Sequence, residues 1–218
     1  MNFKRSAALA LGCLGLAAQA FAQSDSSVVL PVLVYNYANV PNATLHGALR
    51  RAARVFHATG VTFAWHHCRV STKQPQKGPY CSHGISRTDL VLKIHPRSQE
   101  QASGAGKDVG GFVPAGDMVS DAYVFYDRLH DMARQDSADV TALLGSIIAH
   151  ELGHLLTAGS HSSNGMMRAE WTVRSLAQAS LRKMEFTPEQ VQRIHSGALS
   201  RVRHHGEISP FASFQNQE

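Results

Sequence analysis

Two histidines and a glutamate stand together in the segment His150-Glu151-Leu152-Gly153-His154. On a helix, residues four positions apart lie on one face, so both imidazoles can reach a single metal ion. Zinc held in this way lowers the pKa of a water ligand to about 7, and a neighbouring carboxylate can accept the proton that is released. The spacing therefore indicates zinc hydrolase chemistry, with His150 and His154 as ligands and Glu151 as the general base.

A third histidine, His161, follows shortly after the pair. Gly159 lies between them, and a glycine allows the chain to leave a helix through a left-handed conformation and turn back. We therefore expect His161 to complete three imidazole ligands for one Zn²⁺ per chain. Glu170, which lies further along the chain after His154, is the alternative third ligand.

The motif needs a rigid support, and the residues before it provide one. Apolar side chains recur at helical spacing over residues 138–157, which predicts an amphipathic helix with Ser137 as its N-cap. The motif falls late in this helix. The segment Thr187-Pro188-Glu189-Gln190 has the pattern of a capping box with proline at the first helical position, so a last helix is expected to start there.

The chain before the motif alternates between strand and helix patterns. Runs rich in β-branched and aromatic residues predict strands, and apolar spacing after Asn42 predicts a helix that Gly60 ends. This order favours an α+β fold with a mixed, twisted sheet, a long active-site helix and a helical C-terminal subdomain. The expected strands are 28–37, 61–65, 89–95 and 120–126, and the expected helices are 42–59 and 127–133.

Two segments are predicted mainly as loops. Residues 71–84 are polar and contain two prolines, and residues 97–111 are rich in serine, glutamine and glycine. Within the second loop, residues 109–113 have two interpretations. They can form an edge strand along which an extended peptide pairs, or they can be a flexible loop.

The N-terminus has the layout of a secretory signal peptide. Lys4 and Arg5 precede an apolar run, and Ala20-Phe21-Ala22 places small residues at the cleavage positions. We therefore expect cleavage after Ala22 and a secreted or periplasmic protein. The remaining residues, 23–218, suit one catalytic domain. Its expected parts are an α/β lobe at about 27–158, a C-terminal lobe at about 159–206 and a tail at 207–218.

The cysteines agree with export. Cys13 is lost with the signal peptide, which leaves Cys68 and Cys81. Export favours a disulfide between them, and a loop of that size contributes about 3 kcal/mol in the chain-entropy model. The alternative is that both cysteines join His66, His67 or His83 in a metal site, although their spacing fits no common zinc pattern.

Charge excludes some classes of partner. The formal net charge of +5 falls to +3 when Lys4 and Arg5 are removed, since 5 − 2 = 3. The basic C-terminal residues lack the aromatic interleaving of nucleic-acid sites. We therefore expect no nucleic-acid partner. We also expect no contact with a membrane once the signal peptide is removed. The expected protein is a monomer that acts on a peptide or protein substrate.

The histidine cluster, followed by Gly165-Met166-Met167, resembles the metzincin clan of zinc endopeptidases, and most closely its matrixin-type segments. The resemblance implies a zincin fold with His150, His154 and His161 as ligands and Glu151 as general base and acid. It also implies Met167, or Met166, as the methionine of a tight turn beneath the metal. The chain departs from the pattern in one respect, because the connection from the second to the third histidine is one residue longer.

Two further segments, 123–128 and 186–190, are similar to exported bacterial metzincin-like proteins. The interpretation that follows is a secreted zinc endopeptidase. Two alternatives stay open. One is an exported, zinc-stabilised binding module without activity, and the other is a zinc amidase that acts on a non-peptide amide.

Overall fold

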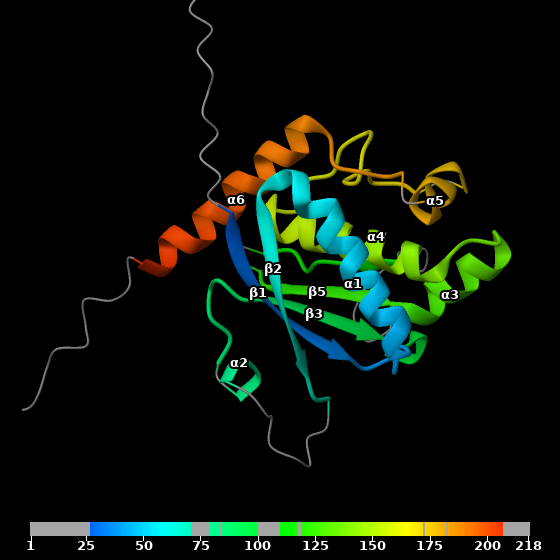
Figure 1. The fold of residues 1–218 in the computed structure, drawn as a ribbon, viewed down its shortest axis with the longest axis horizontal. Helices are drawn as coiled ribbons and strands as arrows, with labels where there is room; N and C mark the ends of the chain where they lie inside the picture. Colours follow the sequence, from blue (N-terminus) through cyan, green and yellow to red (C-terminus); the bar gives the residue numbers. More distant parts are fainter. Residues whose placement is uncertain are drawn as a thin grey trace, which may run out of the picture.

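The computed structural model describes residues 27–70, 79–82, 84–99, 110–116, 119–171, 173–181 and 183–206 (Figure 1). The signal peptide expected at 1–22 and the tail expected at 207–218 lie outside these residues. Among the helices described, none combines the length and the apolar character that crossing a bilayer requires.

The centre of the fold is a five-stranded mixed sheet in the order β2-β1-β3-β5-β4. Four strands run parallel, and β4 pairs antiparallel with β5 at the edge. Alternate side chains of a strand point to opposite faces, so Leu30, Val32 and Val34 of β1 all enter the same core. The strands are β1 Val28–Asn36, β2 Val61–Cys68, β3 Leu90–His95, β4 Gly111–Phe112 and β5 Asp121–Phe125.

Six α-helices are described, and α1 and α4 pack closely against each other. A Cβ atom on Gly145 of α4 would lie 2.6 Å from the carbonyl oxygen of Ala48, so only glycine permits this approach. The helices are α1 Asn42–Phe56, α2 Pro79–Ser82, α3 Tyr126–Gln135, α4 Val140–Leu156, α5 Val173–Ser180 and α6 Pro188–Gly206, with short 3-10 turns at His57–Thr59 and Arg97–Gln99.

Helix α4 is the element that carries the motif, and it lies at the centre of the molecule (Figure 1). Every residue from Ala142 to Leu156 is buried, so the predicted amphipathic character is wrong. The physical reason is that α1, α3, α5, α6 and the sheet contact this helix from several sides. The predicted N-cap is also wrong. The carboxylate of Asp139, and not Ser137, accepts hydrogen bonds from the amides of Thr141 and Ala142.

The opposite face of the sheet carries the disulfide between Cys68 and Cys81. The two cysteines pack there with Leu33 and Val91, whose side chains point away from the core that β1 and β3 share with α4. Helix α2 therefore lies across the sheet from α4 (Figure 1). The expected disulfide is present, and it is remote from the histidine motif.

The segments with ambiguous patterns have mixed outcomes. Gly111–Phe112 form the edge strand β4, as one of the two interpretations of 109–113 predicted. Within the polar segment 71–84 the structure contains the short helix α2, and residues 71–78 and 83 lie outside the described part. Helix α5 was not predicted as a separate element.

Candidate metal centre

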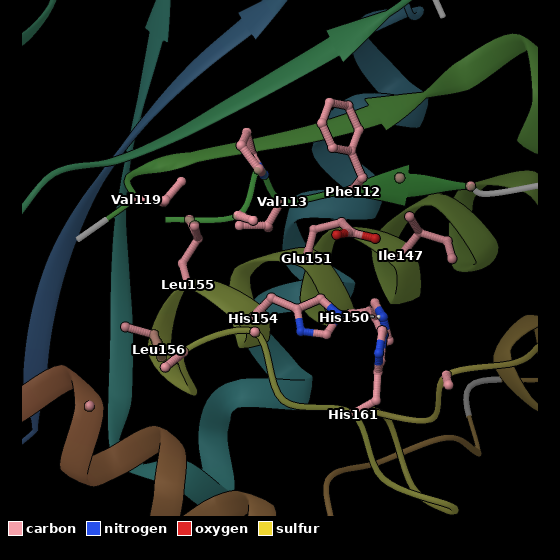
Figure 2. Close-up of a pocket in the computed structure, with 18 of the residues that line it drawn as sticks. Phe112, Val113, Val119, Ile147, His150, Glu151, His154, Leu155, Leu156 and His161 are labelled. Carbon is pink, nitrogen blue, oxygen red and sulfur yellow. Dashed lines mark hydrogen bonds between the residues drawn. The ribbon is translucent and has the colours of Figure 1, made fainter. Parts of the chain in front are cut away.

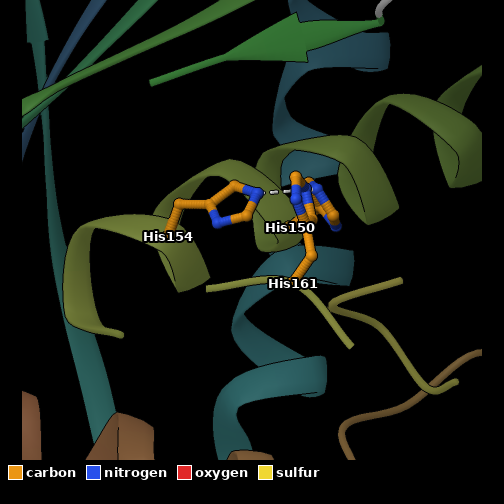
Figure 3. A group of neighbouring side chains, drawn as sticks. All are labelled: His150, His154 and His161. Atoms are coloured by element: carbon orange, nitrogen blue, oxygen red, sulfur yellow. Dashed lines mark hydrogen bonds between the residues drawn. The ribbon is translucent and has the colours of Figure 1, made fainter. Parts of the chain in front are cut away.

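Three imidazoles converge at the C-terminal half of α4 (Figure 3). His150 and His154 come from consecutive turns of the helix, and His161 comes from the segment that follows it. Each residue offers one nitrogen, and these atoms all lie within 4.8 Å of one another. The structure thus brings together all three histidines that the sequence singled out. Glu170 is exposed and lies outside this group.

The chain reaches His161 through two consecutive left-handed residues. Ala158 has a φ of 53° and Gly159 has a φ of 75°. The amide of Gly159 donates to the carbonyl of His154 at 3.0 Å, which closes the end of the helix. The sequence indicated the glycine but not the left-handed alanine. With Ala158 and Gly159 both left-handed, the longer connection still turns back and brings His161 to the other two histidines.

A backbone carbonyl orients His150. Its Nδ1 lies 2.7 Å from the carbonyl oxygen of Met166. A carbonyl oxygen only accepts, so Nδ1 carries the hydrogen and Nε2 keeps its lone pair. That Nε2 lies 3.0 Å from Nε2 of His154. Burial lowers the pKa of His150 to about 4 and the pKa of His154 to about 3, so both rings are neutral at pH 7.

The donor set fits zinc. Neutral imidazole nitrogens are common zinc ligands, and three protein ligands are typical of a catalytic site that keeps one position open. Two buried polar atoms beside the cluster also lack hydrogen-bond partners in the described structure, Nδ1 of His154 and Oε2 of Glu151. Buried polar atoms are normally paired, so their lack of partners agrees with a site made for a further group.

Glu151 lies between strand β4 and the histidines (Figure 2). The residue is 3% exposed, and burial raises the pKa of its carboxyl group well above the usual value. A Cβ atom on Gly111 would lie 2.8 Å from Oε1 of Glu151 and 2.5 Å from the carbonyl oxygen of Tyr123. The missing side chain at Gly111 therefore leaves the space that the carboxylate occupies.

Two buried methionines, Met166 and Met167, contact the helix that carries the motif. A Cβ atom on Gly153 would lie 2.5 Å from the Sδ atom of Met167, so this methionine packs directly against the helix turn between His150 and His154. Met166 contributes its backbone carbonyl to His150 instead. The two residues therefore contact the motif differently, Met167 through its side chain against α4 and Met166 through its carbonyl oxygen.

The cluster lies in a groove of about 1090 Å³ (Figure 2). The three histidines and Glu151 line it. Residues of β4 and the following segment to Gly116 form one side, and the segment from Ala169 to Trp171 contributes to the lining as well. Trp171 is part of this lining, and its ring centroid lies 5.8 Å from that of His150.

Comparison with known proteins bears on the fold. No protein-family model matches the sequence, and no curated protein sequence matches it either. The structure is similar to the crystal structure of a zinc-dependent peptidase from Methanocorpusculum labreanum, with a TM-score of 0.52 and 14% sequence identity. The match covers 75% of this chain and 99% of that chain. This chain shares the fold of a zinc-dependent peptidase.

A second match is weaker. The solution structure of TM1509 from Thermotoga maritima matches with a TM-score of 0.33 and 9% identity, over 84% of this chain and 99% of that one. The comparison therefore rests on the zinc-dependent peptidase. At 14% identity this similarity shows a shared fold and does not extend to particular residues.

The sequence did not indicate several residues that hold the site. The amide of Met166 donates to the carbonyl of Glu185 at 2.9 Å. Buried Arg51 of α1 donates to the carbonyl of Met184 at 2.7 Å and pairs with the carboxylate of Glu185 at 3.0 Å. Backbone carbonyls leave no signal in a sequence. An arginine in the middle of an otherwise apolar helix face, such as Arg51, is the one signal that was available.

Proposed function

We propose that this chain is an exported zinc-dependent endopeptidase of the metzincin type. The observation that carries the proposal is the convergence of three imidazole nitrogens within 4.8 Å in a groove that Glu151 also lines. The fold shared with a zinc-dependent peptidase supports it. The likeness of the motif and its methionine to the metzincin pattern agrees with it.

In the proposed site, His150, His154 and His161 hold one zinc ion. The ion supplies Lewis acidity, which polarises a carbonyl oxygen and lowers the pKa of a water molecule. Glu151 accepts a proton from the water that attacks the carbonyl carbon. The same carboxyl group then donates that proton to the nitrogen of the peptide bond as the bond to carbon breaks.

The burial of Glu151 suits this role. Its Oε2 has no hydrogen-bond partner in the described part of the chain, so this oxygen is available to take part in proton transfer. A raised pKa brings a carboxyl group closer to neutral pH, where it can both accept and donate.

Strand β4 is the proposed support for the substrate. It is the last strand of the sheet, and its residues Gly111 and Phe112 line the groove beside Glu151. An edge strand offers unpaired N–H and C=O groups to an extended chain, so a peptide can add to the sheet there. The groove is large enough for several residues of such a peptide.

The test is peptide cleavage by zinc-loaded protein. Wild type and Glu151→Gln, each shown to contain one zinc per chain, are incubated with a mixed peptide library, and new termini are identified by mass spectrometry. We expect cleavage by the wild type and a loss of at least about 10³-fold in the variant. Cleavage by both would remove Glu151 from the mechanism. No cleavage by the wild type would contradict an endopeptidase and favour a non-peptide amide or a binding module.

A further inference from the structure

The third histidine is held differently from the other two. His150 and His154 are buried side chains of α4, so the helix itself fixes their positions. His161 is exposed and lies outside any helix or strand. Its place beside the other two rings therefore depends on whatever anchors the segment from Ser160 to Arg168.

That segment has few bonds of its own. The amide of Ser162 donates to the carbonyl of Met167 at 2.8 Å, and the hydroxyl of Ser162 donates to the carbonyl of Asn164. These two bonds close the loop on itself, but they do not attach it to the rest of the molecule. Three attachments come from its two ends: Ser160 donates to the carbonyl of Thr157, the carbonyl of Met166 accepts from His150, and the amide of Met166 donates to the carbonyl of Glu185.

The middle of the segment is attached by Gln190, in the first turn of α6. Its Nε2 donates to the hydroxyl of Ser162 at 2.7 Å and to the carbonyl of Asn164 at 2.8 Å. Its Oε1 accepts from the amide of Met167 at 3.5 Å. Gln190 is 5% exposed, so these bonds are shielded from water. One amide group thus binds the loop directly after His161 and again at the amide of Met167.

Gln190 also caps its own helix. Its Oε1 accepts from the amide of Thr187 at 3.1 Å, and the hydroxyl of Thr187 accepts from the amide of Gln190. This is the capping box that the sequence predicted. A glutamate serves equally well in a capping box, because only its oxygen is used there. The two bonds that Nε2 donates require glutamine.

We propose that Gln190 is a positioning residue for the metal site, and that its amide holds the loop that brings His161 to the ion. The inference rests on the proposed function, because it assumes that His161 binds zinc. Gln190 touches neither the metal ligands nor a substrate in this account. It acts through Ser162 and Asn164, and the capping-box motif at the start of α6 is thereby part of the metal centre.

The variant Gln190→Glu separates the two tasks of the residue. The carboxylate keeps the bond to the amide of Thr187 and so retains the cap, but it cannot donate to the carbonyl of Asn164. The matched control is Gln192→Glu, an exposed residue of the same helix with the same change in charge. Zinc affinity is measured by competition with a chelator, and the melting temperature is measured on the metal-free proteins.

We expect Gln190→Glu to bind zinc about 10- to 100-fold more weakly than Gln192→Glu, the range found when residues that orient metal ligands are changed. The metal-free melting temperature of Gln190→Glu should be lower than that of Gln192→Glu, because its carboxylate is buried against the carbonyl of Asn164. Equal zinc affinity in the two variants would overturn the proposal. If wild type and Gln192→Glu bind no zinc, the proposed function fails instead, so the two failures are distinguishable.

A double-mutant cycle with His161→Ala separates positioning from a general loss of structure. If Gln190 acts through His161, then Gln190→Glu should change zinc affinity by less than about twofold once His161 is absent. The same fold-change in both backgrounds would show that Gln190 affects the fold as a whole, and would overturn the proposal even where both single variants bind zinc weakly.

Discussion

The sulfur of Met167 lies directly against Gly153, in the turn of α4 between His150 and His154, where a Cβ atom would meet Sδ at 2.5 Å. Gly153→Ala therefore forces the methionine or the helix to move. Alanine is favoured over glycine in a helix by about 1 kcal/mol, but overpacking a full core costs typically about 1–3 kcal/mol. We expect a net loss of stability in urea unfolding of the metal-free protein.

A second substitution tests whether that contact is the cause. Met167→Ala removes the sulfur, so adding it to Gly153→Ala should cost less than the sum of the two single changes. Strict additivity in urea unfolding would show that Gly153 and Met167 do not interact.

Gly111→Ala should impair catalysis more than zinc binding. The added Cβ would lie 2.8 Å from Oε1 of Glu151 and 2.5 Å from the backbone carbonyl oxygen of Tyr123. Because the backbone of β5 cannot easily move, we expect the side chain of Glu151 to be displaced. A displaced general base is expected to lower kcat/KM by about 10- to 100-fold, within the range that general-base catalysis contributes. Peptide cleavage and zinc content are measured on the same samples.

Gly84→Ala is the matched control for this prediction, because a Cβ atom there would meet nothing within 4 Å. Full activity in Gly111→Ala would show that the carboxylate of Glu151 does not need the position that it has beside β4. A loss of activity in Gly84→Ala as well would point to a general effect of replacing glycine.

The histidine pair makes the stability of the metal-free protein depend on pH. Burial holds the pKa of His150 at about 4, against 6.5 for an ordinary histidine. The unfolded chain therefore binds more protons between these values, so the contribution of His150 to stability is complete above pH 6.5 and is lost as the pH falls towards 4. A shift of this size corresponds to about 3 kcal/mol in all.

The measurement compares the metal-free wild type with His150→Gln by urea unfolding at pH 7.5 and pH 5.0. We expect acidification to reduce the advantage of the wild type by about 2 kcal/mol. The raised pKa of Glu151 acts in the opposite direction, but it is present in both proteins and largely cancels. An advantage that does not change with pH would contradict a buried, neutral His150.

The disulfide should support the fold without supporting the site. Cys68 and Cys81 are 13 residues apart and lie across the sheet from α4. Replacing both with serine should lower the free energy of unfolding by about 3 kcal/mol, the chain-entropy value for a loop of this size. Zinc affinity should stay within about twofold of the wild type. A large loss of zinc affinity would show that the two faces of the sheet are coupled.

The sequence predicted those parts of the site that depend on spacing along one element. His150, Glu151 and His154 share a helix, so their neighbourhood follows from helical geometry alone. Gly159 signalled the turn that follows, and the box from Thr187 to Gln190 signalled the start of α6. In each case the controlling interactions are local, within about one helical turn.

The parts that could not be predicted depend on contacts between distant segments. The carbonyl of Met166 orients His150, and Gly111 makes room for Glu151 from another strand. Neither contact leaves a pattern in the chain. The burial of α4 on all sides also depends on elements far away in sequence, so its apolar residues suggested one core face where the structure has several.

The most direct test of the account is which side chains hold the zinc. Wild type, His161→Ala and Glu170→Ala are loaded with zinc and dialysed against the same weak chelator, and the metal content of each chain is measured. We predict one zinc per chain for the wild type and for Glu170→Ala, and a loss of zinc from His161→Ala. Zinc retained by His161→Ala but lost from Glu170→Ala would contradict the three-histidine centre.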